Sequence, residues 1–313
     1  MDPLSDVLSL LRPRSVMSGG VDYGGDWAVA FGPHAGIKFL AVIRGGCWLA
    51  IEGVDEPIRI GAGDCFLLPR GWPFRLASDL ALAPADATAF LQVPLHGAVR
   101  TVNGGGGCLA IGGHFAFAGK PAEMLRSMLP PIVHLHSETD KAAMRWSVER
   151  LMQELREPEP GGALIAQQLA QMLLVQALRL HLRSNAGQGA GWLFALADRQ
   201  IGAALSAMHG QPGHRWTIEA LARHAAMSRS TFALKFKRLV GAAPMGYLTR
   251  WRMLLAADRL SNAGETVSAL APALGYESES AFSTAFKRVM GAPPRHYSRG
   301  REAAPEGASL LPG

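Results

Sequence analysis

Two Lys-Arg pairs, fifty residues apart, have the residue types and spacing to bind a phosphate backbone. Lys237 and Arg238 return as Lys287 and Arg288, and serines and threonines stand shortly before each pair. Cationic side chains contact phosphate oxygens, and hydroxyl groups hydrogen-bond to phosphates or to base edges. The residues therefore predict recognition of double-stranded DNA, and we predict no catalytic residue.

The three cysteines are the second group with chemistry of its own. Cys47, Cys65 and Cys108 are an odd and sparse set, so structural disulfides are not expected. Cys47 and Cys65 lie in apolar strand patterns, which favours burial as small hydrophobic residues. Cys108 follows a run of glycines and is the candidate redox residue, because thiol sensors need an accessible cysteine of low pKa. A thiol-based sensor therefore stays open as an alternative function.

The Lys-Arg pairs belong to a unit that occurs twice. Residues 227–241 match residues 277–291 at an offset of fifty, and such a repeat indicates one supersecondary unit used twice. In each copy a serine is placed to cap a helix, and phenylalanines four apart share one face. A glycine then suits a left-handed C-cap. The matched residues are Ser228 with Ser278, Phe232 with Phe282, Phe236 with Phe286, Gly241 with Gly291, Pro244 with Pro294 and Tyr247 with Tyr297.

A shorter apolar pattern precedes each capped helix. Residues 217–225 and 266–274 match at an offset of 49, so the extra residue falls in the turn of the second copy. Helix, tight turn and capped helix is the plan of a helix-turn-helix, whose second helix enters the major groove of DNA. Helical hairpins are common, and a basic C-terminus suits any helix dipole, but two copies in register favour DNA binding.

Successive residues of a helix are rotated by about 100°, which assigns each residue of the capped helices to an inward face or to an outward face that can enter a groove. The residues predicted to face the bases are Arg229, Ser230, Ala233 and Leu234 in the first unit and Glu279, Ser280, Ser283 and Thr284 in the second. The predicted phosphate contacts are Lys237, Arg238, Arg252, Lys287 and Arg288. Between the units, residues 244–260 predict a stiff helix of about 25 Å. Such a helix can set the two recognition helices about 34 Å apart, close to one turn of DNA.

These segments resemble the AraC/XylS family of bacterial transcription regulators. The resemblance rests on residues 216–222 (WTIEALA), 227–232 (MSRSTF), 247–253 (YLTRWRM) and 275–288 (GYESESAFSTAFKR), and it covers roughly residues 198–301. It implies seven helices that form two helix-turn-helix units. Leu234 and Thr284 depart from the family, whose members often carry arginine there, so base recognition would lean on serines, methyl contacts or DNA shape. Pro272 lies inside the first helix of the second unit and predicts that this helix is bent or short.

The first half of the chain is typical of a small β-barrel. Short branched or aromatic runs at residues 37–43, 47–51, 58–60 and 65–68 are separated by glycine, proline and aspartate. Residues 24–27, 61–71 and 112–115 resemble the cupin-like sensor domains that precede AraC-type DNA-binding domains. That resemblance implies a barrel that senses a small molecule or a chemical stress, followed by helices that dimerise. The candidate effector-pocket residues are His34, Trp48, Phe74 and His114, with His96 as a further histidine, although isolated histidines are often structural.

A cupin-type metal enzyme is the other alternative. Its metal site needs a His-x-His pair, a carboxylate and a later histidine. The expected strands carry none of these, and His134-Leu-His136 has the spacing but follows Pro130-Pro131, beyond the barrel. We interpret that pair as a polar edge, we predict no metal and no cofactor, and we do not expect an enzyme.

Length and charge divide the chain in the same way. With 313 residues, of which 49% are hydrophobic, it can bury two cores. Residues 198–301 contain 15 Lys and Arg against 6 Asp and Glu, whereas residues 1–197 contain 16 against 17, as expected for a nucleic-acid domain joined to another domain. The predicted fold class is α+β with two domains. The predicted segments are a cupin-like sensing and dimerisation domain at 1–184, a linker at 185–191, an AraC-type DNA-binding domain at 192–301 with helix-turn-helix units at 217–239 and 266–289, and a flexible tail at 302–313.

Helical periodicity at residues 140–155 and 163–182 predicts two helices packed on the barrel, and a short helix is expected at residues 6–11. Leu173, Leu174 and Leu180 form an apolar face that either joins a second subunit or stays buried in its own domain.

No segment is expected to reach transmembrane length, so the protein is predicted to be cytoplasmic and associated with the bacterial nucleoid. The predicted partners are promoter DNA, an unknown small-molecule effector, a second copy of the chain and RNA polymerase, with no membrane. The predicted role is that of a transcriptional activator.

Overall fold

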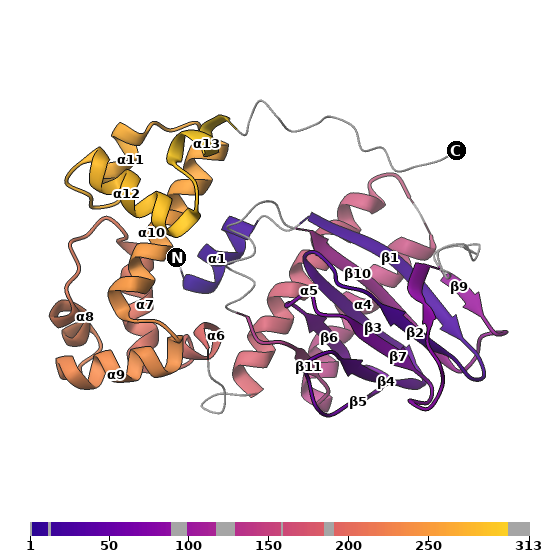
Figure 1. The fold of residues 1–313 in the computed structure, drawn as a ribbon. Coiled ribbons are helices and arrows are strands. Elements are labelled where there is room, and N and C mark those ends of the chain that lie inside the picture. The colour runs from indigo at the N-terminus through magenta and orange to yellow at the C-terminus, as the bar shows by residue number, and fades with distance from the viewer. Residues whose placement is uncertain are drawn as a thin grey trace. The chain divides into compact units, whose positions relative to one another are not determined.

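The computed structural model describes residues 2–11, 14–88, 99–116, 129–157, 159–184 and 191–299. These residues belong to two compact units, one built from strands and two long helices and the other from the remaining helices (Figure 1). The predicted α+β class with two domains is confirmed. The predicted tail, His96 and the predicted linker apart from Gly191 lie outside the described residues.

Two sheets of short strands form the first unit. Its strands are β1 (Arg14–Tyr23), β2 (Ala28–Phe31), β3 (Ile37–Arg44), β4 (Gly46–Ile51), β5 (Ile58–Gly61), β6 (Cys65–Leu68), β7 (Phe74–Ala77), β8 (Ala85–Asp86), β9 (Val99–Val102), β10 (Cys108–Ala116) and β11 (Val133–Leu135). They pair in the orders β11-β6-β3-β10-β1-β9 and β5-β4-β7-β2-β8. The four strands predicted from the sequence correspond to β3, β4, β5 and β6 and are confirmed within one residue at each end.

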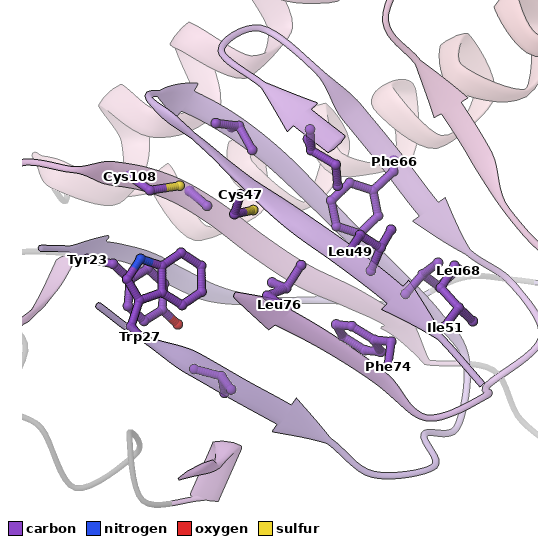
Figure 2. Close-up of a cluster of buried hydrophobic side chains, with 14 residues drawn as sticks. Tyr23, Trp27, Cys47, Leu49, Ile51, Phe66, Leu68, Phe74, Leu76 and Cys108 are labelled. Carbon is purple, nitrogen blue, oxygen red and sulfur yellow. The ribbon is translucent and has the colours of Figure 1, made fainter. Parts of the chain in front are cut away.

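One apolar core lies between the two sheets (Figure 2). Along β4 burial alternates, so Cys47, Leu49 and Ile51 point into this core while Trp48 lies on the other face. Strand β6 is buried at every position because the six-stranded sheet is covered on its outer side. Period-two alternation therefore predicts the inner face of a strand whose sheet is covered on one side, whereas a continuously apolar run indicates cover on both faces.

Two long helices supply that cover. Helix α4 (Glu138–Arg156) starts at a cap in which Ser137 Oγ accepts from the backbone N–H of Asp140 at 3.1 Å, and helix α5 (Gly162–Ser184) packs against α4, β1, β6 and β11. Contrary to the expectation from sequence, Gly162–Arg183 is long and apolar enough to cross a membrane by length and composition. In the fold Leu173 and Leu174 are buried within the unit, as in the internal alternative, whereas Leu180 of the same predicted face is only partly buried. The large apolar residues that α4 and α5 expose are Trp146, Leu164 and Ile165.

The second unit is helical. Its helices are α1 (Pro3–Leu11), α6 (Trp192–Ala195), α7 (Arg199–Gly210), α8 (Ile218–His224), α9 (Arg229–Val240), α10 (Pro244–Asp258), the π-helix η1 (Arg259–Ala263), α11 (Val267–Ala273), α12 (Glu279–Met290) and α13 (Pro294–Arg299). Helix α11 contains Pro272 yet is as long as α8, its counterpart in the repeat. Pro272 is the penultimate residue of α11, and therefore it does not shorten this helix.

The N-terminal helix α1 packs on α7 and α10 rather than on the strands that follow it in sequence. A chain of buried polar groups holds this contact. Trp192 Nε1 donates to the Tyr247 hydroxyl at 2.7 Å, that hydroxyl lies 2.7 Å from His209 Nε2, and His209 Nδ1 lies 3.2 Å from an Asp6 carboxylate oxygen. Burial lowers the pKa of His209 to about 3, so the ring is neutral at pH 7 and its Nδ1–H can donate to Asp6.

Candidate nucleic-acid interface

The two helix-turn-helix units form as the repeat predicts, because each capping residue is used. Ser228 caps α9 by accepting from the backbone N–H of Thr231, and Ser278 caps α12 by accepting from that of Ala281. The helices end at Gly241 and Gly291, whose φ angles are +80° and +77°. Glycine adopts this left-handed conformation without the steric penalty that a Cβ brings.

The turns before α9 and α12 share one backbone conformation but not one residue type. Ala226 has φ +50° in the first turn, and Gly275 has φ +77° at the matching position of the second. In each turn the following N–H closes on the preceding helix: Met227 donates to Ala222 O, and Tyr276 donates to Ala271 O, both at 2.9 Å. The extra residue of the second copy, Glu277, lies after this shared bend, so the bend itself is unchanged.

The inward faces of α9 and α12 are anchored by phenylalanine pairs. Phe232, Phe236, Phe282 and Phe286 are fully buried. The ring centroids lie 5.5 Å apart in the first pair and 5.8 Å apart in the second. Because residues four apart share a helix face, this burial turns the opposite faces toward solvent.

Most residues predicted to contact DNA lie on those solvent faces. Ser230 and Leu234 are exposed on α9, and Glu279, Ser280 and Thr284 are exposed on α12. Ala233 and Ser283 are partly buried beside them. Lys237, Arg238, Lys287 and Arg288 are all exposed at the C-terminal ends of the same helices. Leu234 is 73% exposed, an unusual place for a large apolar side chain in water.

Ion pairs border these faces. Arg229, the first residue of α9, pairs with Glu219 of α8 at 2.9 Å, and both side chains are more than half exposed. Arg215 pairs with Glu277 at 3.1 Å with similar exposure. Exposed pairs of this kind contribute little to stability, so Arg229 remains available to exchange Glu219 for a phosphate or a base.

Arg252 has a different role from the phosphate contact predicted for it. Its guanidinium is partly buried and donates to Pro212 O at 2.6 Å and to His214 O at 2.8 Å. It also lies over the ring of Tyr276, 5.7 Å from the centroid. These contacts tie α10 to the segment before α8 and to the turn before α12. Arg252 therefore supports the geometry between the two units instead of standing free for DNA.

Arg250 is a candidate that the sequence reasoning missed. It is exposed on α10 and lines a groove with Met245, Gly246, Thr249, Arg288 and Val289. A cationic groove of this kind suits a phosphate. A helical-wheel test would have found it, because Leu248, Trp251 and Leu254 define the buried face of α10 and Arg250 lies away from it.

The connection between the units is longer than one regular helix. Helix α10 ends at Asp258 and continues as the π-helix η1 to Ala263, where Gly264 has φ +68°. Arg259 holds Glu265 through two guanidinium contacts of 2.6 Å. This bidentate pair fixes the exit of the connector where α11 begins.

Two of the four effector-pocket candidates lie together in the strand unit. Phe74 lines a cavity of about 230 Å³. The His34 ring packs edge-on against the Phe74 ring, with the two ring centroids 5.8 Å apart. His34 Nε2 also lies 3.3 Å from Leu68 O. Trp48 lies instead on the outer face, against Arg59. His114 pairs with Lys38 across β10 and β3, and burial together with Lys38 lowers its pKa.

The cavity wall contains groups that sequence reasoning did not single out. Phe31 stacks on Phe74 with centroids 4.4 Å apart, and the Lys38 ammonium lies 5.9 Å from the centre of the Phe31 ring. Desolvation lowers the pKa of Lys38. The cavity is therefore a mainly apolar space with a cation on its wall.

His134 has a protein partner. Its Nε2 lies 3.3 Å from an Asp64 carboxylate oxygen, and the Lys141 ammonium lies 3.2 Å from the other oxygen of Asp64. Burial lowers the pKa of His134 despite this carboxylate. Within the described residues no group of three or more His, Cys, Asp or Glu side chains could hold a metal ion. The polar-edge interpretation of His134 and His136 agrees with these contacts.

Comparison with known proteins assigns both halves of the chain. A family model described as Cupin matches residues 2–183, and one described as Helix-turn-helix domain matches residues 221–300. An AraC-like transcription regulator of Streptomyces antibioticus is 44% identical over 96% of this chain and 99% of its own length. The transcriptional activator RclR of Escherichia coli K12 is 29% identical over 97% of this chain and all of its own. The crystallised DNA-binding domain of AdpA, in complex with target DNA, is 30% identical over 35% of this chain and 99% of that domain, with a TM-score of 0.33.

Proposed function

We propose that this chain, which belongs to the AraC-like family of DNA-binding transcription regulators, binds promoter DNA through the exposed faces of α9 and α12. One observation carries the proposal. The same capped helix occurs twice, each copy buries a phenylalanine pair, and each therefore presents hydroxyl groups followed by a Lys-Arg pair to solvent. Base contacts are assigned to Arg229, Ser230, Ala233, Leu234, Glu279, Ser280, Ser283 and Thr284, and phosphate contacts to Lys237, Arg238, Lys287 and Arg288, with Arg250 added.

Ser230 and Ser280 should set part of the sequence preference. Both are exposed in the first turn of their helices, where the N-terminal residues of a recognition helix meet base edges. Replacing either with alanine should relax the preference at one or two base pairs, with a cost of about 1–3 kcal/mol per lost contact. Selection of bound DNA from a random pool, run in parallel on wild type and variants, measures this. Identical selected sequences for all three proteins would exclude these serines from base recognition.

We further propose that the strand unit senses the signal, in the cavity lined by Phe31, Lys38 and Phe74. Its apolar wall favours a small apolar molecule, and Lys38 favours one that carries a carboxylate or another anion. The proposal has four further parts. The chain activates transcription, contacts RNA polymerase and is located in the cytoplasm. It also forms a homodimer through the exposed side chains of Trp146, Leu164 and Ile165.

Benzene and benzoate test this cavity, because they share a ring and differ by one carboxylate. Benzoate should bind more tightly than benzene by about tenfold, the ratio that one charge-assisted hydrogen bond provides. Lys38→Met keeps the side-chain length and should abolish that difference while leaving benzene affinity unchanged. Calorimetric titration gives both constants. If either probe failed to bind wild type, or if Lys38→Met kept the wild-type preference for benzoate, the cavity would not be one that recognises anions through Lys38.

A further inference from the structure

Two of the three cysteines lie side by side in the core of the strand unit. Cys47 on β4 and Cys108 on β10 are each 2% exposed and belong to the same apolar cluster, next to Tyr23 and Trp27 (Figure 2). The two side chains lie close enough for each to shift the pKa of the other. Neither residue has a cysteine near it in sequence, so the pair is a product of the fold.

The backbone holds this pair in place. At Gly45, in the turn between β3 and β4, an added Cβ would overlap the carbonyl oxygen of Gly107 and lie 3.1 Å from Cys108 Cα. Arg44 and Leu109 are paired across β3 and β10 directly beside this contact. The start of β4 is thus packed against the start of β10 by main-chain atoms. This backbone packing brings Cys47 and Cys108 into the same apolar cluster.

The two thiols are polarised in opposite directions. The pKa of Cys108 is lowered, mainly because Cys47 donates a hydrogen bond to its sulfur, with the positive charges of Arg59 and Arg44 adding to the effect. The pKa of Cys47 is raised by the same hydrogen bond and by burial. Cys65 differs from Cys108, since burial raises its pKa to about 12. Cys108 is therefore the nucleophile of the pair and Cys47 the proton donor.

The segment that precedes Cys108 is an exposed loop that can open locally. Cys108 directly follows four consecutive glycines, and Gly104, Gly105 and Gly106 have φ angles between +68° and +93°. This loop is largely exposed and is fastened by the Asp22 carboxylate, which accepts from the Gly106 N–H at 3.0 Å and pairs with Arg44. Segments with few buried apolar contacts open at low free-energy cost. Tyr23, the partner of Cys108 across β1 and β10, also lines the proposed sensing cavity.

We propose that Cys47 and Cys108 form a reversible intramolecular disulfide when the protein meets a small two-electron oxidant such as hydrogen peroxide, and that this bond changes its control of transcription. The inference rests on the proposed function, because the bond can change transcription only if the chain binds promoter DNA, and it adds an oxidant to the signals of the strand unit. It assigns the reactive role to a pair of cysteines, whereas the sequence pointed to Cys108 alone.

The chemistry balances with the peroxide as the sole co-reactant. The Cys108 thiolate attacks one peroxide oxygen, the S–O bond forms, the O–O bond breaks, and hydroxide leaves and is protonated to water. Cys47 sulfur then attacks Cys108 sulfur, the S–S bond forms, and the S–O bond breaks to release a second water carrying the Cys47 proton. Two thiols lose two hydrogens and two electrons, and hydrogen peroxide gains them as two waters.

The experiment treats the full-length reduced protein with stoichiometric hydrogen peroxide and maps cross-linked peptides under non-reducing conditions. Variants Cys47→Ala, Cys108→Ala and the control Cys65→Ala are run in parallel, each checked for folding by thermal unfolding. Wild type and Cys65→Ala should give a Cys47–Cys108 cross-link that dithiothreitol reverses. Cys47→Ala should instead accumulate over-oxidised Cys108, and Cys108→Ala should stay unmodified at Cys47.

The regulatory half of the inference is measured on DNA selected with the reduced protein. Oxidation should change affinity for that DNA, or transcription from it, by about fivefold or more, and Cys47→Ala and Cys108→Ala should not respond. A wild type that leaves both thiols free, or cross-links another pair, overturns the chemistry. A correct cross-link without any effect on DNA binding or transcription overturns the regulation. If the reduced protein selects no DNA sequence, the proposed function fails, and the peptide map still decides the chemistry independently.

Discussion

Replacing Lys237 and Lys287 together with alanine should make DNA binding markedly less sensitive to salt. Each lysine is exposed at the C-terminal end of a recognition helix, on the face opposite the buried phenylalanines. Each phosphate contact releases about one condensed counterion, so the slope of log K against log salt should fall by about one per lysine and about two for the pair. Binding should weaken similarly on all sequences, because phosphate contacts carry no base information.

A charge-matched control separates contact from overall attraction. Arg156 and Arg179 are exposed on α4 and α5 in the strand unit, and replacing both with alanine removes the same net charge. That double variant should keep the wild-type slope. Titrations over a range of salt concentrations measure all three proteins. If the lysine variant and the arginine variant gave the same slope, long-range attraction would explain the data and the assigned contacts would be discarded.

Gly275→Ala should be strongly destabilising. Gly275 has φ +77°, and a Cβ there would lie 2.5 Å from the carbonyl oxygen of Gly213. The left-handed conformation costs a Cβ-bearing residue about 1–2 kcal/mol, and the backbone overlap adds to it, so we expect a loss of roughly 3 kcal/mol in the free energy of unfolding. The displaced segment also supplies the Pro212 and His214 carbonyls that hold Arg252, so the junction between the two units would loosen.

The repeat provides the inverse substitution as a control. Ala226 occupies the matching position with φ +50°, so Ala226→Gly should relieve strain and raise the free energy of unfolding by up to about 1 kcal/mol. Chemical denaturation measures both variants. A loss in Ala226→Gly comparable to that in Gly275→Ala would mean that the entropy lost by glycine outweighs the strain in this turn.

The sequence alone determined those parts of the structure that depend on neighbours along the chain. Ser228, Ser278, Gly241 and Gly291 cap α9 and α12 as expected, because a cap is a hydrogen bond or a dihedral angle within four residues. The phenylalanines four apart define the buried faces, and so the exposed ones, for the same reason. The strands at residues 37–68 followed from short branched or aromatic runs separated by glycine, proline and aspartate. The sequence alone therefore predicts the duplicated helix-turn-helix unit.

Only the tertiary structure decided where distant groups meet. The sequence predicted a phosphate contact for Arg252, but its guanidinium donates hydrogen bonds to backbone carbonyls some forty residues away. It predicted a pocket position for Trp48, but the pairing of β4 turns that side chain to the outer face. Helix α1 packs on α7 and α10 through Asp6 and His209, a contact across 203 positions. Cys47 and Cys108 lie in one apolar cluster because the start of β4 packs against the start of β10. Such pairings depend on how sheets and helices pack in three dimensions, and no local pattern of residue types encodes them.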